Sequence, residues 1–194
     1  MREFRSPSTI LLVPVPPVDH NLMVYLQAQL SSVFHTAVEL YPKRDVSPSS
    51  TFDFGRNQFN STAILGTALN RFNGNSAKIL CVTALDLFVP VLTFVFGEAQ
   101  LDGTAAIVST HRLDEMFYGL PKNQQILEER LFKEAVHELG HTFGLIHCHD
   151  YECVMHSSTS VEEIDVKSLT FCANCTEKLN PGIDTATKER RMEL

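Results

Sequence analysis

The sequence predicts an α/β fold in which helices pack on a mostly parallel sheet. Short apolar runs alternate with longer segments whose apolar residues recur at helical spacing, in the order β-α-β-α-β. Strands that alternate with helices favour parallel pairing, because each crossover returns the chain to the same end of the sheet. The 194 residues suffice for one domain with a sizeable core.

The first half of the chain supplies three expected strands and two expected helices. Residues 9–15 and 36–41 are predicted to be strands, and 18–34 between them shows helical spacing. A second helix is expected over 56–72, and a buried strand over 77–84.

The second half supplies two short strands, expected at 93–97 and 104–110, and a long helix at 124–143. On this helix a set of apolar and small side chains lies within about 80° of Leu139. The set comprises Leu131, Phe132, Ala135, Val136, Thr142 and Phe143. One face is therefore built to pack. The charged residues of the helix are interpreted as its solvated part: Glu128, Glu129, Arg130, Lys133 and Glu134.

The end of this helix carries the run H-E-x-x-H-x-x-G-x-x-H, opposite the packing face. His137 and His141 are only about 40° apart on a helix, so both can reach one metal ion. His147 would lie about 240° further round if the helix continued. Gly144 can adopt the left-handed conformation that ends a helix, so His147 can return as a third ligand.

Three histidine ligands leave the fourth position of a zinc ion open for water, as a catalytic site needs. Glu138 follows the first ligand and is placed to act as general base. The motif therefore predicts zinc-dependent hydrolysis of peptide bonds in a peptide or protein substrate.

The motif is followed at once by four cysteines spaced C-x4-C and, eighteen residues later, C-x-x-C: Cys148, Cys153, Cys172 and Cys175. This spacing suits a closed structural zinc site, with disulfides as the alternative. The opening residues contain no apolar signal-peptide core, so a cytoplasmic location is expected, where thiols stay reduced and zinc is favoured. The fifth cysteine, Cys81, lies in an apolar run and is expected to be a buried core thiol. His149 and His156, which flank the cluster, are expected to be solvated loop residues.

From His137 to Cys175 the chain resembles the archaemetzincin family, a branch of the metzincin metalloproteases that joins the long zinc motif to four cysteines. The resemblance implies a metzincin-like fold: a twisted, mostly parallel sheet with an antiparallel edge strand, backing and zinc-site helices, and a small irregular C-terminal subdomain. It also implies that Met155 lies in a methionine turn beneath the catalytic zinc, and that substrate binds along an edge near residues 92–98.

These observations define one metalloprotease domain over residues 1–194, with an upper subdomain (1–144) and a lower subdomain (145–194) that holds the cysteine site. Two zinc ions are expected, one catalytic and one structural. The competing hypothesis is a non-catalytic two-zinc module that binds peptides or mediates interactions.

The composition limits the classes of partner that we expect for this protein. The net charge is −7 with no Lys/Arg-rich patch, which argues against nucleic acid. The sequence contains no 18-residue apolar span, so no membrane segment is expected. Hydrophobic residues at 44% and charged residues at 20% are ordinary for a globular protein, and a monomer is expected.

Overall fold

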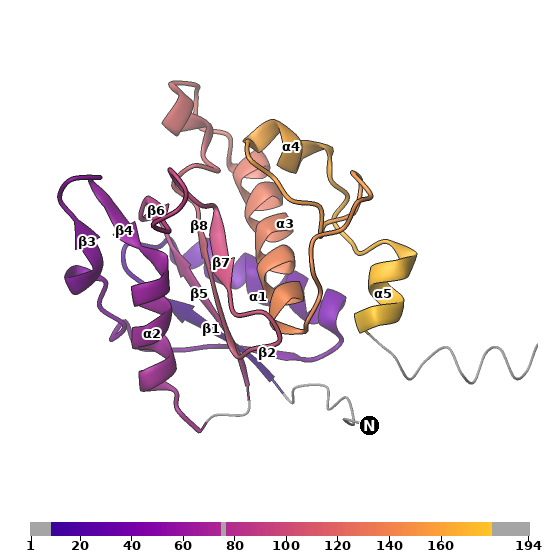
Figure 1. Cartoon of the computed structure of the whole chain (residues 1–194), viewed down its shortest axis with the longest axis horizontal. Coiled ribbons are helices and arrows are strands. Elements are labelled where there is room, and N and C mark those ends of the chain that lie inside the picture. The colour runs from indigo at the N-terminus through magenta and orange to yellow at the C-terminus, as the bar shows by residue number, and fades with distance from the viewer. Residues whose placement is uncertain (1–8, 75–76, 180–194) are drawn as a thin grey trace, which may run out of the picture.

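A five-stranded sheet forms the centre of the molecule (Figure 1). The computed structural model describes residues 9–74 and 77–179, so the outer limits of both predicted subdomains lie outside the described residues. The strand order is β2-β1-β5-β8-β7. The bounds are β1 Thr9–Pro14, β2 Ala37–Leu40, β5 Lys78–Thr83, β7 Gly97–Ala99 and β8 Ala105–Ser109. The first four strands of this order pair in parallel, and β7 pairs antiparallel with β8 at one edge. The predicted α/β fold with a mostly parallel sheet is confirmed.

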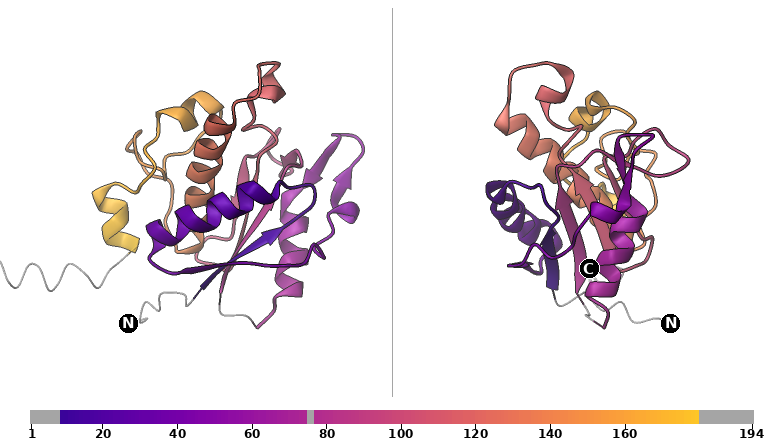
Figure 2. Two further views of the ribbon diagram at one scale, coloured as in Figure 1. Left: turned by 180° about the vertical axis from the view of Figure 1, so that it is seen from behind. Right: turned by 90° about the vertical axis from the view of Figure 1, so that its left-hand side faces the viewer.

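Helices cover both faces of this sheet (Figure 2). α1 (His20–Phe34) and α3 (Gln124–Thr142) pack on one face, and α2 (Ser61–Arg71) packs on the other. Strand side chains alternate between the two sides: Leu12 and Leu80 enter the core under α1 and α3, whereas Val13 and Cys81 enter the core under α2. Because both faces are buried, the strands are continuous apolar runs in the sequence.

The starts of α1 and α2 are set by capping side chains. Asp19 Oδ1 accepts the backbone N–H of Asn21 at 2.9 Å, and Asn60 Oδ1 accepts that of Ala63 at 3.0 Å. α1 therefore begins two residues inside its predicted range. The prediction that a helix starts at residue 56 was wrong, because Asn60 caps α2 and residues 58–60 form a strand.

That strand, β4 (Gln58–Asn60), belongs to a small second sheet that the sequence did not predict. β4 pairs antiparallel with β3 (Phe52–Asp53), which follows the short 3-10 helix η1 (Ser49–Thr51), and parallel with β6 (Leu87–Phe88). The prediction of a strand at 93–97 was also misplaced. Val95 makes only an isolated bridge to Leu87, and regular pairing with the main sheet begins at Gly97.

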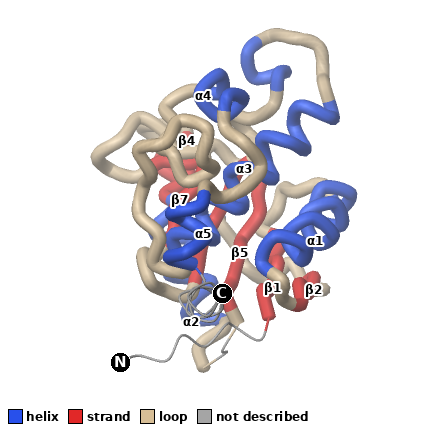
Figure 3. Tube along the Cα trace, turned by 90° about the vertical axis from the view of Figure 1, so that its right-hand side faces the viewer, coloured by secondary structure: helices blue, strands red, loops and turns tan. Residues whose placement is uncertain are grey.

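The chain beyond α3 is mostly loop and runs along one side of the helix (Figure 3). It contains two short helices that were not predicted, α4 (Val161–Val166) and α5 (Ala173–Leu179). Before α3, the chain forms a short 3-10 helix, η2 (Glu115–Tyr118). The apolar side chains of this region, such as Val154 and Ile164, share one core with α1 and α3. Within the described residues, no helix is long and apolar enough to cross a membrane.

Candidate functional site

The end of α3 is a closed turn of the kind that a glycine permits. Gly144 has φ of +87° and donates its N–H to the His141 carbonyl at 2.9 Å, while Leu145 donates to the Gly140 carbonyl at 3.1 Å. These two bonds form a Schellman motif, which requires a left-handed residue at this position. The chain therefore reverses after α3 and brings His147 back toward the helix, as the sequence predicted.

The three histidines meet at this bend, with ring centroids 4.7 to 5.3 Å apart. The carbonyl oxygen of Val154 accepts from Nδ1 of His137 at 2.8 Å, and that of Leu145 accepts from Nδ1 of His141 at 2.7 Å. Since carbonyls only accept, both rings are protonated at Nδ1 and present the Nε2 lone pair to the centre.

These two Nε2 atoms are 3.1 Å apart, and the candidate ligand atoms of all three rings lie within 4.8 Å of one another. Two lone pairs facing each other at this distance repel unless a cation lies between them. Two zinc–nitrogen bonds of about 2.0–2.1 Å at a tetrahedral angle would place such atoms about 3.3 Å apart. The three histidines therefore fit a zinc ion.

Electrostatics keep these rings in the neutral form that binds metals. Burial, helped by the positive charge of Lys167, lowers the pKa of His137 well below its ordinary value. Burial also lowers the pKa values of His141 and His147. Metal binding at neutral pH would therefore displace few protons from these side chains.

Glu138 is a buried carboxylate beside the three rings. Burial raises its pKa well above the ordinary value, and the charge of Glu134 adds to this effect. Its carboxylate makes no hydrogen bond or ion pair within residues 9–74 and 77–179. An unpaired carboxylate with a raised pKa, facing a cleft, is suited to accept and release a proton near neutral pH.

Gly97 on β7 gives this side chain its room, a role that the sequence analysis missed. A Cβ at Gly97 would lie 2.6 Å from both Cγ and Oε1 of Glu138 and 2.7 Å from the carbonyl oxygen of Ile107. Only glycine fits here without moving Glu138. The available signal was a glycine at the end of an apolar strand pattern, which often marks a close approach.

Two hollows flank the site, and His137, Glu138 and His147 line both. One, of about 330 Å³, lies between residues 92–97 and 157–159. The other, of about 430 Å³, runs along β7 and includes Glu98, Ala99, Leu101 and Ile146 in its wall. Among the described residues β7 is the last strand of the sheet, and an open strand edge between two hollows offers backbone groups and side-chain space to an extended peptide.

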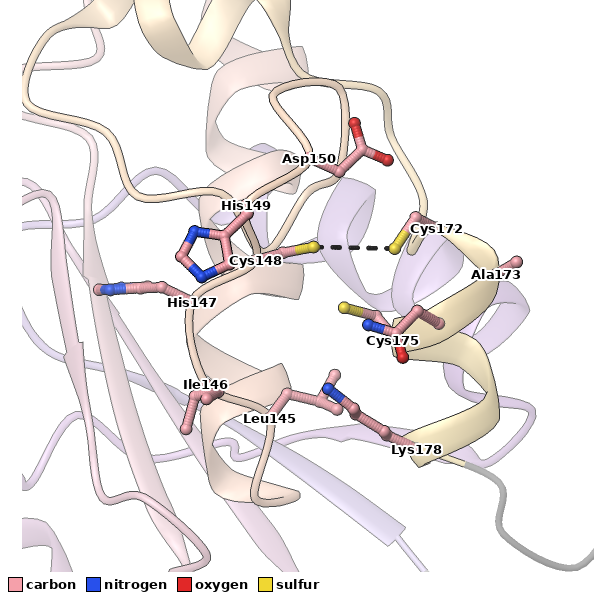
Figure 4. Close-up of a pocket in the computed structure, with 11 residues that line it drawn as sticks. Leu145, Ile146, His147, Cys148, His149, Asp150, Cys172, Ala173, Cys175 and Lys178 are labelled. Carbon is pink, nitrogen blue, oxygen red and sulfur yellow. Dashed lines mark hydrogen bonds between the residues drawn. The ribbon is translucent and has the colours of Figure 1, made fainter.

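The four cysteines also converge, on the other side of the loop that follows α3 (Figure 4). Their sulfur atoms lie within 4.8 Å of one another, with Cys148 Sγ and Cys172 Sγ 3.8 Å apart. Four zinc–sulfur bonds of about 2.3 Å in a tetrahedron would place the sulfurs about 3.8 Å apart. The cluster therefore fits a closed zinc site. Cys81 lies apart in the core, where burial raises its pKa to about 12.

Met155 is fully buried in a tight turn under α3. His156 donates its backbone N–H to the Cys153 carbonyl at 2.8 Å, so Val154 and Met155 occupy the centre of this turn. A Cβ at Gly140 would collide with the Met155 sulfur, so the methionine packs directly against the helix between two of the histidines. Met155 therefore lies against the part of α3 that carries His137 and His141.

The interpretation of the α3 charges as solvated was wrong for three of the five residues. Arg130, Lys133 and Glu134 are buried because each has a partner in or beside α4. Arg130 binds both carboxylate oxygens of Asp165 at 2.7 Å, and Lys133 donates to the Asp165 carbonyl at 3.1 Å. Glu134 pairs with the buried Lys167 at 3.0 Å.

One of the two flanking histidines also departs from expectation. His149 is exposed, but His156 is half-buried. Its ring packs at a tilt against Tyr151, with centroids 4.4 Å apart, and its Nδ1 donates to the Cys148 carbonyl at 2.8 Å. It therefore belongs to the structure around the cysteine cluster. Its spacing from Cys148 in the sequence gave no sign of this contact.

Known proteins share this fold and these segments. The model of peptidase family M54 matches residues 27–181. The archaemetzincin of Methanocaldococcus jannaschii is 41% identical over 170 residues, covering 88% of this chain and 92% of that protein. The structure of the archaemetzincin from Archaeoglobus fulgidus, complexed with malonate, superposes with a TM-score of 0.76 at 36% identity, covering 88% and 99% of the two chains. A zinc-dependent peptidase from Methanocorpusculum labreanum gives a TM-score of 0.77 at 33% identity, covering 88% and 100%. The chain therefore belongs to peptidase family M54, the archaemetzincins, and is a zinc metallopeptidase.

Proposed function

We propose that this protein hydrolyses peptide bonds at the site formed by His137, His141 and His147, with Glu138 as general base. One observation carries the proposal: three neutral imidazoles converge beside a buried carboxylate that has no partner among the described residues. The chemistry thus needs no rearrangement of ligands or base.

Zinc held by these imidazoles would supply a Lewis acid that lowers the pKa of a bound water to about 7 and polarises the scissile carbonyl. Glu138 accepts the proton of the attacking water and passes it to the leaving amine. Gly97 and the end of α3 hold this carboxylate at the cleft. Its raised pKa makes this carboxylate a stronger base than an ordinary glutamate.

The substrate is proposed to be a peptide or protein segment bound in extended form along the free edge of β7. Gly97, Glu98 and Ala99 form this edge, and the two hollows take side chains on either side of the scissile bond. Glu98 is held in place by the hydroxyl of Thr62 at 2.7 Å and that of Ser61 at 2.5 Å, so the edge is fixed before substrate arrives.

A second zinc ion, bound by the four cysteines, is proposed to be structural. It would join the loop after His147 to the start of α5, in a region with few regular elements. The same proposal makes Met155 the methionine of the turn under the catalytic site and Gly144 the divide between the upper and lower subdomains. A monomer remains the expected state.

The test is a comparison of wild type and Glu138→Gln on a peptide library. Loss of a general base should lower kcat by about 10²- to 10⁴-fold. Zinc content should stay at two ions per chain. Glu39→Gln, which changes an exposed carboxylate on β2, is the matched control and should retain full activity.

The alternative is a zinc module that binds peptides without cleaving them. Equal inertness of wild type and Glu138→Gln across the library, with peptide binding retained by both, would favour this alternative. Equal cleavage by both proteins would instead remove Glu138 from the role of base.

A further inference from the structure

The three histidines are not oriented in the same way. His137 and His141 each donate Nδ1–H to a backbone carbonyl, the usual arrangement for a metal-binding imidazole. His147 is an exposed residue, and its ring lies beside those of His137 and His141 but makes no hydrogen bond to any residue in 9–74 or 77–179. Its position must therefore be set by the backbone that carries it.

The neighbouring residue is fixed at three points. Cys148 donates its backbone N–H to the Met155 carbonyl at 2.9 Å and accepts from Nδ1 of His156 at 2.8 Å. Its sulfur lies in the cysteine cluster, 3.8 Å from Cys172 Sγ. Figure 4 shows His147 and Cys148 projecting to opposite sides of the same loop, and the two residues belong to different ligand clusters.

His147 lies between two anchored residues. On one side Leu145 is buried and is hydrogen-bonded to Gly140 and His141, and Ile146, which follows it, is 63% exposed. On the other side Cys148 is directly bonded to His147, and consecutive Cα atoms are about 3.8 Å apart, so a shift of the Cys148 backbone also displaces His147. Metal–ligand distances tolerate only about 0.2 Å. The position of His147 at the ion therefore depends on the anchoring of Cys148 as well as on that of Leu145.

Both backbone contacts of Cys148 come from the turn 153–156, and this turn begins with another cysteine of the cluster, Cys153. Cys172 donates its N–H to the Cys153 sulfur at 3.3 Å, which ties the turn to the start of α5. The contacts that hold Cys148 thus come from the cluster itself and from a turn that begins with a cluster residue.

We propose that the four-cysteine cluster is a positioning device for His147, so that a filled cluster is a condition for tight metal binding by the three histidines. The inference rests on the two-zinc assignment proposed above. By linkage, metal at the three histidines tightens metal at the cysteines by the same factor.

The experiment measures zinc affinity at the three-histidine site by competition with a chromophoric chelator. Co²⁺ absorption distinguishes the two sites, because thiolates give charge-transfer bands that imidazoles lack. Cys172→Ser removes a cluster ligand far from His147 in the sequence and should weaken the three-histidine site by about 10- to 100-fold. Cys172→His keeps a metal ligand at this position and should restore most of that affinity.

Ile64→Ala is the control for a general loss of stability, because it opens a cavity in the separate core under α2. It should lower Tm and leave zinc affinity at the histidines unchanged. An equal loss of affinity in Ile64→Ala and Cys172→Ser would overturn the inference, as would wild-type affinity in Cys172→Ser.

A second variant, with one glycine inserted between His147 and Cys148, keeps all four cysteines and tests the link if Cys172→Ser does not fold. It should retain the Co²⁺–thiolate bands and lose affinity at the histidines. Wild-type affinity at both sites in this variant would overturn the inference. If wild type binds two zinc ions but the sites are not coupled, this inference fails and the two-zinc assignment stands. If wild type binds a single zinc ion, both the inference and the two-zinc assignment fail.

Discussion

The part of the chain up to the end of α3 and the part that follows it are held together by different forces. The first is built of regular elements whose apolar side chains fill two cores on either side of the sheet. The second, residues 145–179, consists of two short helices and loops that share one of these cores, and it adds the cysteine cluster and buried ionic contacts with α3. The candidate active site lies where these two parts meet.

The difference shows what each part contributes to the site. The helix supplies His137, His141 and Glu138 at fixed spacing. The irregular part supplies His147 and, through the carbonyls of Leu145 and Val154, the two hydrogen bonds that orient the helical histidines. Regular structure therefore sets the spacing of two ligands and the base, and irregular structure adds the third ligand and orients the other two.

The largest effect should come from breaking the ionic contact between the parts. Lys167 and Glu134 are both buried, so Lys167→Met leaves an unpaired carboxylate beside Glu138 and should cost about 3–5 kcal/mol of unfolding free energy. The double variant Lys167→Met/Glu134→Met removes both charges and should recover most of the loss. Urea denaturation measures both. A loss below about 1 kcal/mol in the single variant would mean that the pair does not hold the two parts together.

The next effect separates catalysis from stability at the contact of β7 with α3. Gly97→Ala places a methyl group against Glu138, and an ångström-scale displacement of this base should lower kcat/KM about a hundredfold, equivalent to about 2.7 kcal/mol in the barrier. Gly66→Ala is the matched control, because a Cβ there meets nothing within 4 Å, and it should keep full activity. Activity in Gly97→Ala equal to that of the control would show that the cleft tolerates a displaced Glu138.

The smallest effect concerns the unfolding free energy that is lost because the ionised Glu138 carboxylate is buried. Its pKa is raised on folding, so the folded protein holds this proton more tightly than the unfolded chain, and ionisation at high pH reduces stability. The penalty is full above the folded-state pKa, shrinks as pH falls below it, and disappears below the lower pKa of the unfolded chain. In the metal-free protein, Glu138→Gln should therefore raise stability at pH 8 by about 1–2 kcal/mol, a few degrees in Tm, and by less at pH 5. Thermal scans at the two pH values measure the difference. A benefit that is the same at both would contradict a raised pKa as its cause.

The sequence predicted the features that depend on local spacing. The approach of His137 and His141, the bend at Gly144 and the cysteine cluster all follow from residues close together in the chain. The partners of Arg130 and Glu134 could not be predicted, because Asp165 and Lys167 lie more than thirty residues away and a charge run on a helix is usually solvated. Gly97 was missed for the same reason: its requirement comes from Glu138, a residue in another element.

The free edge of β7 has a consequence for which chains are cut. In the proposed binding mode, the outward backbone groups of Gly97 and Ala99 offer ladder positions beside Glu138, so a bound segment must already be extended to use them. Segments locked in helices or in sheets have their backbone groups engaged elsewhere and would have to unfold first. In the proposed binding mode, a stably folded protein is therefore protected from cleavage, and the enzyme acts on chains that have lost their structure or never had one.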